Sequence, residues 1–178
     1  MGVGKMSRVF LTADLHFGDA SIIEYEKRPF SSVEAMDEAL IANWNCAVSD
    51  NDTIIVAGDF SSHGAERTTE ILKQLKGRKI LVRGNHDWMS SEAYGLAGFS
   101  EVSSRPIIHK DWFVISHEPP HYYNDSMPFF YIYGHVHGTE LYPTITKQSA
   151  CVCVERWDYR PVDFHDLLER AGLTKTEG

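Results

Sequence analysis

The sequence predicts an α/β fold in a single domain that spans residues 1–178. In the first half of the chain, short apolar runs typical of buried strands alternate with helical patterns, which is the rhythm of βαβ units with parallel strands. The apolar runs end abruptly in Gly, Asp, Asn or His, and ligands in α/β folds bind outside the carboxyl ends of strands. The composition, 43% hydrophobic and 24% charged, is ordinary for a globular protein.

The first half of the chain is expected to form three strands and two helices. Ser31-Ser32-Val33-Glu34 is typical of a capping box, and apolar residues then recur at helical spacing as far as Ala47. A second helix has its apolar stripe around Ile71 and Leu75, and Gly77 can cap its end. The strands are expected over residues 8–13, 52–57 and 78–83.

After Asp87 the pattern changes to short strands, with one helix-prone piece over residues 91–97. Only Lys110-Asp111 separates the first two of these strands, so hairpins are expected in this part of the chain rather than crossovers. Asp163 can cap a final helix that Gly172 closes. The strands are expected over residues 105–109, 112–116, 129–133 and 150–155.

Composition and charge disfavour several kinds of protein. The net charge of −8 argues against an extended nucleic-acid surface, because such binding depends mainly on Lys and Arg. No apolar run approaches the ~20 residues that a membrane-spanning helix needs, so no membrane contact is expected. Three cysteines and no apolar segment of signal-peptide length near the start predict free, buried thiols and a cytoplasmic location.

Side chains that can bind metal ions follow five of the expected strands. They are carboxylates, imidazoles and one amide without any thiolate, a donor set that suits Mn, Fe, Ni or Zn. In extended backbone, residues at i and i+2 point to the same side, so closely spaced pairs can reach one centre. These side chains are more numerous than the four ligands that one tetrahedral ion binds, which favours two divalent ions. They are Asp14, His16, Asp59, Asn85, His86, His117, His135 and His137.

Two adjacent ions favour chemistry at a phosphoryl group. Such a pair deprotonates a bridging water, whose hydroxide attacks, and absorbs the charge that develops during in-line displacement. His86 is then left over as a general acid for the departing oxygen. Asp87 follows it directly and is available to fix the tautomer of its imidazole.

Five short motifs follow one another along the chain, and this ordered set resembles that of the calcineurin-like metallophosphoesterase superfamily. Within it, the chain resembles the short, single-domain bacterial and phage branch. The resemblance implies a four-layer αββα sandwich with parallel or mixed sheets. It also implies that Asp59 bridges the ions and that His86 assists the leaving group. The motifs are Asp14-x-His16, Gly58-Asp59, Gly84-Asn85-His86-Asp87, His117 and Gly134-His135-x-His137. The implied ligands are Asp14, His16, Asp59 and His137 for one ion, and Asp59, Asn85, His117 and His135 for the other.

The expected activity is hydrolysis of small or nucleotide-type phosphodiesters, with two alternatives. In the protein-phosphatase branch Gly-Asp-x-x-Asp-Arg-Gly grips phosphate through its arginine, but here His63 stands at that position, which disfavours a phosphomonoesterase. A catalytically silent binding scaffold would be expected to lose ligands, and none is missing. Three further residues are candidate substrate contacts, and each has a structural alternative. His63 can instead be a solvated turn residue, Arg83 can form a surface ion pair, and His121 can pack within its loop.

Overall fold

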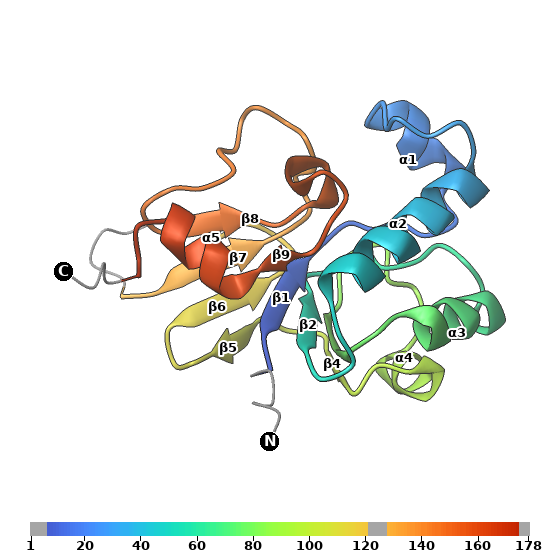
Figure 1. Ribbon diagram of the computed structural model, residues 1–178, viewed down its shortest axis with the longest axis horizontal. Coiled ribbons are helices and arrows are strands. Elements are labelled where there is room, and N and C mark those ends of the chain that lie inside the picture. Colours follow the sequence, from blue (N-terminus) through green and yellow to red (C-terminus); the bar gives the residue numbers. More distant parts are fainter. Residues whose placement is uncertain (1–6, 121–127, 175–178) are drawn as a thin grey trace, which may run out of the picture.

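The strands of this protein bury side chains on both of their faces, and this decides the architecture. The computed structural model describes residues 7–120 and 128–174, which form two β-sheets packed against each other, with helices α1 to α4 on the outer side of the first sheet (Figure 1). Phe10 and Leu11 are neighbours on one strand and are 3% and 0% exposed. Phe10 packs among helices, whereas Leu11 packs between the sheets. Successive residues therefore serve two different cores.

The first sheet brings the carboxyl ends of four parallel strands to one edge. Val9 pairs with Thr53, and Thr53 pairs with Arg78, so the first three strands start level with one another. A short fifth strand joins this sheet antiparallel to the first. In spatial order the strands are β4 (Glu101–Ser103), β3 (Arg78–Val82), β2 (Thr53–Val56), β1 (Val9–Thr12) and β9 (Val162–Asp163).

The second sheet is mixed, with the order β5 (Ile107–His109), β6 (Phe113–Ser116), β7 (Phe130–Tyr133) and β8 (Ser149–Cys151). The hairpin between β5 and β6 is confirmed: the strands are antiparallel, and Lys110 and Asp111 have φ of 49° and 59°, as a tight hairpin turn requires. The expectation of further hairpins is wrong, because β6–β7 and β7–β8 are parallel. Their connections are roughly the dozen residues that a crossover needs.

Helices cover the outer face of the first sheet. The N-caps are partly as expected: Ser32 caps α2 by accepting a hydrogen bond from the N–H of Ala35, and Asp163 caps α5. Trp44, Ile71 and Tyr94 of α2, α3 and α4 are fully buried in the core over this face. The helices on this side are α1 (Ala20–Tyr25), α2 (Val33–Ala47), α3 (Ala65–Gln74) and α4 (Ser91–Ala97). Helix α5 (Phe164–Arg170) packs instead on the core between the sheets, and a short 3-10 helix η1 (Val154–Trp157) precedes it.

A second core fills the space between the sheets. Ile55 of the first sheet and Ile132 of the second are buried there, and Phe164 of α5 packs edge-on against Phe113 at a ring distance of 4.8 Å. The predicted α/β class with mixed sheets is thereby confirmed. In the described part of the chain, no helix has the length and apolar character needed to cross a membrane.

The three thiols are free, and two of them are buried as expected. Cys151 and Cys153 share one face next to Tyr133, with their sulfur atoms 3.1 Å apart. Cys46 lies in α2 as predicted, but its side chain is exposed, so the expectation of burial is wrong for this residue. The expected strand over 150–155 ends early, because the backbone turns into η1 at Val154.

Asp52 ties the starts of β1 and β2 together and gives a testable prediction. Its buried carboxylate accepts hydrogen bonds from the N–H of Arg8 at 2.8 Å and from the N–H and hydroxyl of Ser49 at 2.8 and 2.6 Å. Burial alone would raise the pKa of Asp52, but these hydrogen bonds outweigh it and lower the pKa to about 2. Asp52→Asn should therefore lower the free energy of unfolding by about 1–3 kcal/mol near neutral pH.

Urea unfolding at several pH values checks this prediction. Because the folded-state pKa lies below the unfolded value near 4, the contribution of Asp52 is complete above about pH 4 and disappears as the pH falls towards 2. The difference between wild type and Asp52→Asn should shrink in the same range. Asp50→Asn, an exposed neighbour, is the matched control and should stay within about 0.5 kcal/mol of wild type. A difference that does not vary with pH would contradict the assignment.

Candidate metal centre

Left-handed backbone at the strand ends turns the predicted ligands towards one another. Asp14, His16 and Asp59, which follow β1 and β2, have φ of 58°, 51° and 54°. His135 and His137, which follow β7, have φ of 71° and 45°. This region costs a non-glycine residue roughly 1–3 kcal/mol, and such strain concentrates at functional sites. The shared conformation indicates that these positions are held for a purpose other than stability.

Two glycines make the close approach of these side chains possible. Gly58 has φ of +91°, and a Cβ at this position would collide with the imidazole of His117. A Cβ on Gly134 would collide with the carboxylate of Asp14. The glycines of the sequence motifs therefore leave room for the ligating atoms beside them.

One group of donor atoms is formed by Asp14, His16 and His137, whose candidate ligand atoms lie within 4.8 Å of one another. His137 Nε2 lies 3.7 Å from Asp14 Oδ1. The ring of His16 is 2% exposed, and neither of its nitrogens has a hydrogen-bond partner among the described residues. A buried polar group without a partner is costly, and a metal ion would satisfy it. This imidazole therefore fits a metal ligand better than a structural histidine.

A second group surrounds the amide oxygen of Asn85. Asn85 Oδ1 lies 2.8 Å from His117 Nε2 and 3.0 Å from His135 Nδ1, and the two imidazole nitrogens are 3.1 Å apart. Asp59 Oδ2 lies 3.2 Å from His117 Nε2. Ligands about 2 Å from a shared ion are separated by about 3 Å, so these spacings suit a metal site. The carbonyl of Ala57, 2.9 Å from His117 Nδ1, can accept a hydrogen bond from Nδ1–H, and this tautomer leaves Nε2 free to ligate.

The electrostatics of the centre reflect two buried carboxylates among imidazoles. Burial raises the pKa of Asp14. Burial would also raise the pKa of Asp59, but the imidazoles of His117 and His16, 3.2 and 3.5 Å from its Oδ2, and the backbone N–H of His86 outweigh it and hold that pKa far below its usual value. Burial would lower the pKa of His117, but its hydrogen bond to Asp59 and the charges of Asp14 and Asp59 raise it to about 9. Protons and metal ions therefore compete for the same atoms.

Asp87 has a different task from the one expected from the sequence. Its carboxylate accepts hydrogen bonds from the backbone N–H groups of Asp59, Phe60 and Gly84 at 2.9, 3.0 and 2.8 Å, and from the hydroxyl of Tyr94 at 3.1 Å. None of its hydrogen bonds within the described chain reaches the imidazole of His86. The expectation that Asp87 fixes the tautomer of His86 is corrected: Asp87 instead joins the turns after β2 and β3.

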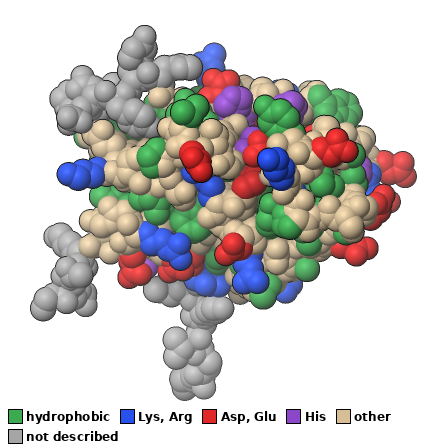
Figure 2. Space-filling model, turned by 90° about the horizontal axis from the view of Figure 1, so that it is seen from above, with side chains coloured by type: hydrophobic (Ala, Val, Ile, Leu, Met, Phe, Trp, Pro, Cys, Tyr) green, Lys and Arg blue, Asp and Glu red, His purple; other side chains and the backbone are tan. Residues whose placement is uncertain are grey.

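A cavity of about 760 Å³ opens over the centre and is bordered on its other side by α1. His86 lines this cavity, with its ring centroid 5.2 Å from that of His16. The backbone N–H of His86 donates a hydrogen bond to Asp59 Oδ1 at 2.8 Å. The other residues of the centre that line it are His16, Asp59, His135 and His137. Figure 2 shows histidine side chains gathered on one face of the molecule with acidic side chains close by.

The candidate substrate contacts have different positions. His63 does not line this cavity; its Nε2 lies 2.7 Å from Asp37 Oδ2, and its ring covers Gly18. Arg83 lines a second cavity beside Asn85, and its guanidinium donates to the backbone carbonyl of Asp87 at 2.6 Å. The surface ion pair considered for Arg83 is not formed with any described residue. His121 lies outside the described residues.

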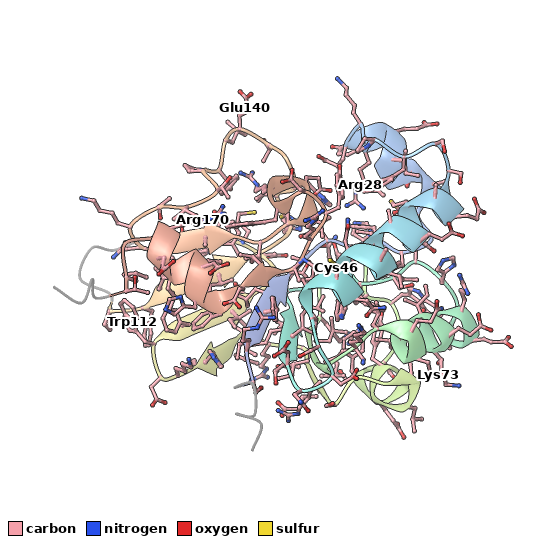
Figure 3. The ribbon with its side chains drawn as sticks, viewed as in Figure 1. Arg28, Cys46, Lys73, Trp112, Glu140 and Arg170 are labelled. Atoms are coloured by element: carbon pink, nitrogen blue, oxygen red, sulfur yellow. The ribbon has the colours of Figure 1, made fainter. Side chains whose placement is uncertain are left out.

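Sequence reasoning missed two supporting residues, Glu155 and Arg28. His137 Nδ1 lies 3.1 Å from Glu155 Oε1, and this carboxylate is held by the buried guanidinium of Arg28 at 3.0 Å from Nε. Arg28 also donates to the backbone carbonyls of Asp14 and Leu15 at 2.7 and 2.9 Å. Figure 3 shows Arg28 close to α1 and α2. Neither residue belongs to a ligand motif, so no local pattern marks them.

Carboxylates, imidazoles and an amide that gather at the strand ends of a two-sheet α/β fold are typical of metal-dependent hydrolases. Comparison with protein families makes the class specific. The chain belongs to the calcineurin-like phosphoesterase family, which matches residues 7–149. Membership implies metal-dependent hydrolysis of phosphoesters, and the resemblance seen in the motifs is confirmed.

Similar proteins cover most of the chain. An uncharacterized protein of Methanocaldococcus jannaschii, MJ1445, is 33% identical over an alignment 181 positions long, which covers 97% of this chain and 97% of that protein. The crystal structure of AQ665, a protein of unknown function from Aquifex aeolicus, matches 93% of this chain and all of that chain, with a TM-score of 0.71 and 24% identity. The crystal structure of the Pseudomonas putida nuclease MPE matches 73% of this chain and 62% of that chain, with a TM-score of 0.51 and 24% identity. At this identity, both structures show a shared fold.

Glu155 supplies the prediction for this centre. A carboxylate on the outer nitrogen of a ligating histidine orients the ring and raises its basicity. Glu155→Gln should therefore weaken the binding of Mn²⁺ by about 10–100-fold, as measured by calorimetric titration. Glu140→Gln removes the same charge from an exposed position at the edge of the molecule and should bind as wild type does (Figure 3). Equal affinities for all three proteins would show that Glu155 does not support the centre.

Proposed function

We propose that the protein is a phosphodiesterase that uses two divalent ions to hydrolyse small or nucleotide-type esters. The observation that carries this proposal is the convergence of donor atoms from five strand ends into two adjacent groups. The first contains Asp14, His16 and His137, and the second contains Asn85, His117 and His135. One group alone would suit a structural or mononuclear site, whereas two adjacent groups suit phosphoryl transfer.

Asp59 is the residue best placed to belong to both groups. Its Oδ2 lies 3.5 Å from His16 Nε2 in the first group and 3.2 Å from His117 Nε2 in the second. Its other oxygen, Oδ1, accepts a hydrogen bond from the backbone N–H of His86, which fixes the carboxylate in place. Divalent ions bound there would activate a water molecule and offset the charge that develops on the phosphoryl group.

The cavity over the centre favours a diester over a monoester. Among the described residues that line it there is no Lys or Arg, while Asp19 and Glu24 are acidic. A monoester carries up to two negative charges on its phosphate, and a diester carries one, so these two carboxylates repel the monoester more strongly. Tyr25 is 81% exposed on α1 and lines the same cavity, where its ring can stack on an aryl group or a nucleobase.

His86 supplies the proton for the leaving oxygen. Its side chain is exposed to the cavity beside His16, while its backbone is anchored to Asp59. The imidazole is therefore free to face substrate instead of joining the buried donor groups. Histidine is the side chain that most often transfers a proton to or from a reacting group in enzymes.

The leaving group tests the role of His86. A general acid contributes roughly 10²–10⁴-fold when the departing oxygen is basic, and little when it is a good leaving group such as p-nitrophenolate. His86→Ala should therefore reduce kcat strongly for an alkyl phosphodiester and only weakly for bis(p-nitrophenyl) phosphate, with unchanged metal content. His165→Ala, on the exposed face of α5, is the control and should behave as wild type. An equal loss on both substrates would reject proton donation by His86.

The preference for diesters is tested with two chromogenic esters. Protein loaded with Mn²⁺ should hydrolyse bis(p-nitrophenyl) phosphate with a higher kcat/KM than p-nitrophenyl phosphate. The reverse order would indicate a phosphomonoesterase. Absence of turnover with Mn, Fe, Ni and Zn despite bound metal would indicate a binding scaffold and would overturn the proposal.

A further inference from the structure

A second cavity, of about 500 Å³, reaches the metal centre from the side of Asn85 and His117. The first cavity reaches the centre through His16, Asp59, His86, His135 and His137, and the two cavities have no described lining residue in common. His135 of the first cavity and His117 of the second lie 3.1 Å apart at their ring nitrogens, so a substrate whose phosphoryl group sits at the centre can extend one part into each cavity. We call the second cavity the arginine pocket, after Arg83 and Arg105 in its wall.

The charges of the arginine pocket differ from those of the first cavity. Arg83 and Arg105 both line it, and neither forms a salt bridge with any residue in the described part of the chain. The exposed carboxylate of Glu118 also lines the pocket but is paired with neither arginine. Elsewhere in the protein, Arg28 and Arg78 are each held by a carboxylate. The positive charge beside Asn85 is thus available to a ligand.

Arg83 is also anchored in a way that suits anion binding. Its Nη2 donates to the backbone carbonyl of Asp87 at 2.6 Å, which positions the guanidinium without neutralising it. Its Nε is buried and has no hydrogen-bond partner in the described chain. A phosphate oxygen is the acceptor that a guanidinium binds most readily, and the part of Arg83 that lines the pocket can donate to one. A held arginine also loses little freedom when it binds.

From these observations we infer that the arginine pocket binds a second phosphate group of the substrate, so that the preferred substrates are phosphodiesters that carry a terminal phosphate. This inference rests on the proposed phosphodiesterase function. The size of the pocket suits one nucleotide-sized arm and not a duplex, in keeping with the net charge of −8, which disfavours an extended nucleic-acid surface.

Two matched substrates test the inference. They are the p-nitrophenyl ester of thymidine 5′-phosphate, with and without an additional 3′-phosphate. For wild type loaded with Mn²⁺, the 3′-phosphate should raise kcat/KM by about tenfold or more, as expected for charge-assisted bonds to two arginines. Arg83→Gln and Arg105→Gln should each bring this ratio towards one. The ratio is unaffected by a general loss of activity, which a disturbed turn after β3 would cause.

Arg67→Gln is the matched control, because Arg67 is an exposed arginine of α3 that lines neither cavity. Its substrate ratio should equal that of wild type. Equal kcat/KM for the two substrates in wild type would overturn the inference and leave the phosphodiesterase proposal intact.

A binding measurement separates the two proposals when turnover is absent. Thymidine 3′,5′-bisphosphate should bind the Mn²⁺-loaded protein about tenfold more tightly than thymidine 5′-phosphate, and Arg83→Gln should abolish the difference. If this difference is found without hydrolysis of any ester, the arginine pocket is supported and the proposed activity is rejected. If the two nucleotides bind equally well, the inference is rejected.

Discussion

The structure depends on the burial of two carboxylates, Asp14 and Asp59, beside each other at the ends of β1 and β2. Removing a carboxylate from water is costly unless positive charge or hydrogen bonds replace the water. Here the balance comes from imidazoles, which reach the carboxylates from the second sheet. Burial raises the pKa of Asp14, and the neighbouring carboxylates of Asp59 and Asp14 raise the pKa of His117, so both shifts favour bound protons at the buried carboxylates. Divalent ions would neutralise these carboxylates more fully than protons do.

The rest of the fold holds these groups in place. Asp87 joins the turns after β2 and β3 through three backbone N–H groups, so Asp59 keeps its position relative to Gly84. Arg28 connects the backbone of Asp14 with Glu155, and Glu155 in turn holds His137. Each sheet thus contributes candidate ligands, and buried ionic contacts between distant segments hold these segments together. The strained backbone of the ligating residues is maintained by these contacts.

The side chains that meet at the candidate metal centre could be located from the sequence because each motif is local: a strand, a small residue and a polar side chain follow one another. The partners of these ligands could not, since Glu155 and Arg28 are separated by 127 positions and have no shared pattern. The role of Asp87 was misjudged for a related reason, because its neighbour in sequence is His86, while its partners are the backbone groups of another turn. Parallel pairing of β6, β7 and β8 was missed because short apolar runs do not specify strand direction.

The most direct test of this account is anomalous diffraction from crystals of the protein grown with Mn²⁺. The account predicts two manganese positions in each chain, one in contact with Asp14, His16 and His137 and the other in contact with Asn85, His117 and His135. The carboxylate of Asp59 should lie between them and contact both. A single manganese position, or manganese bound away from these side chains, would contradict the central claim.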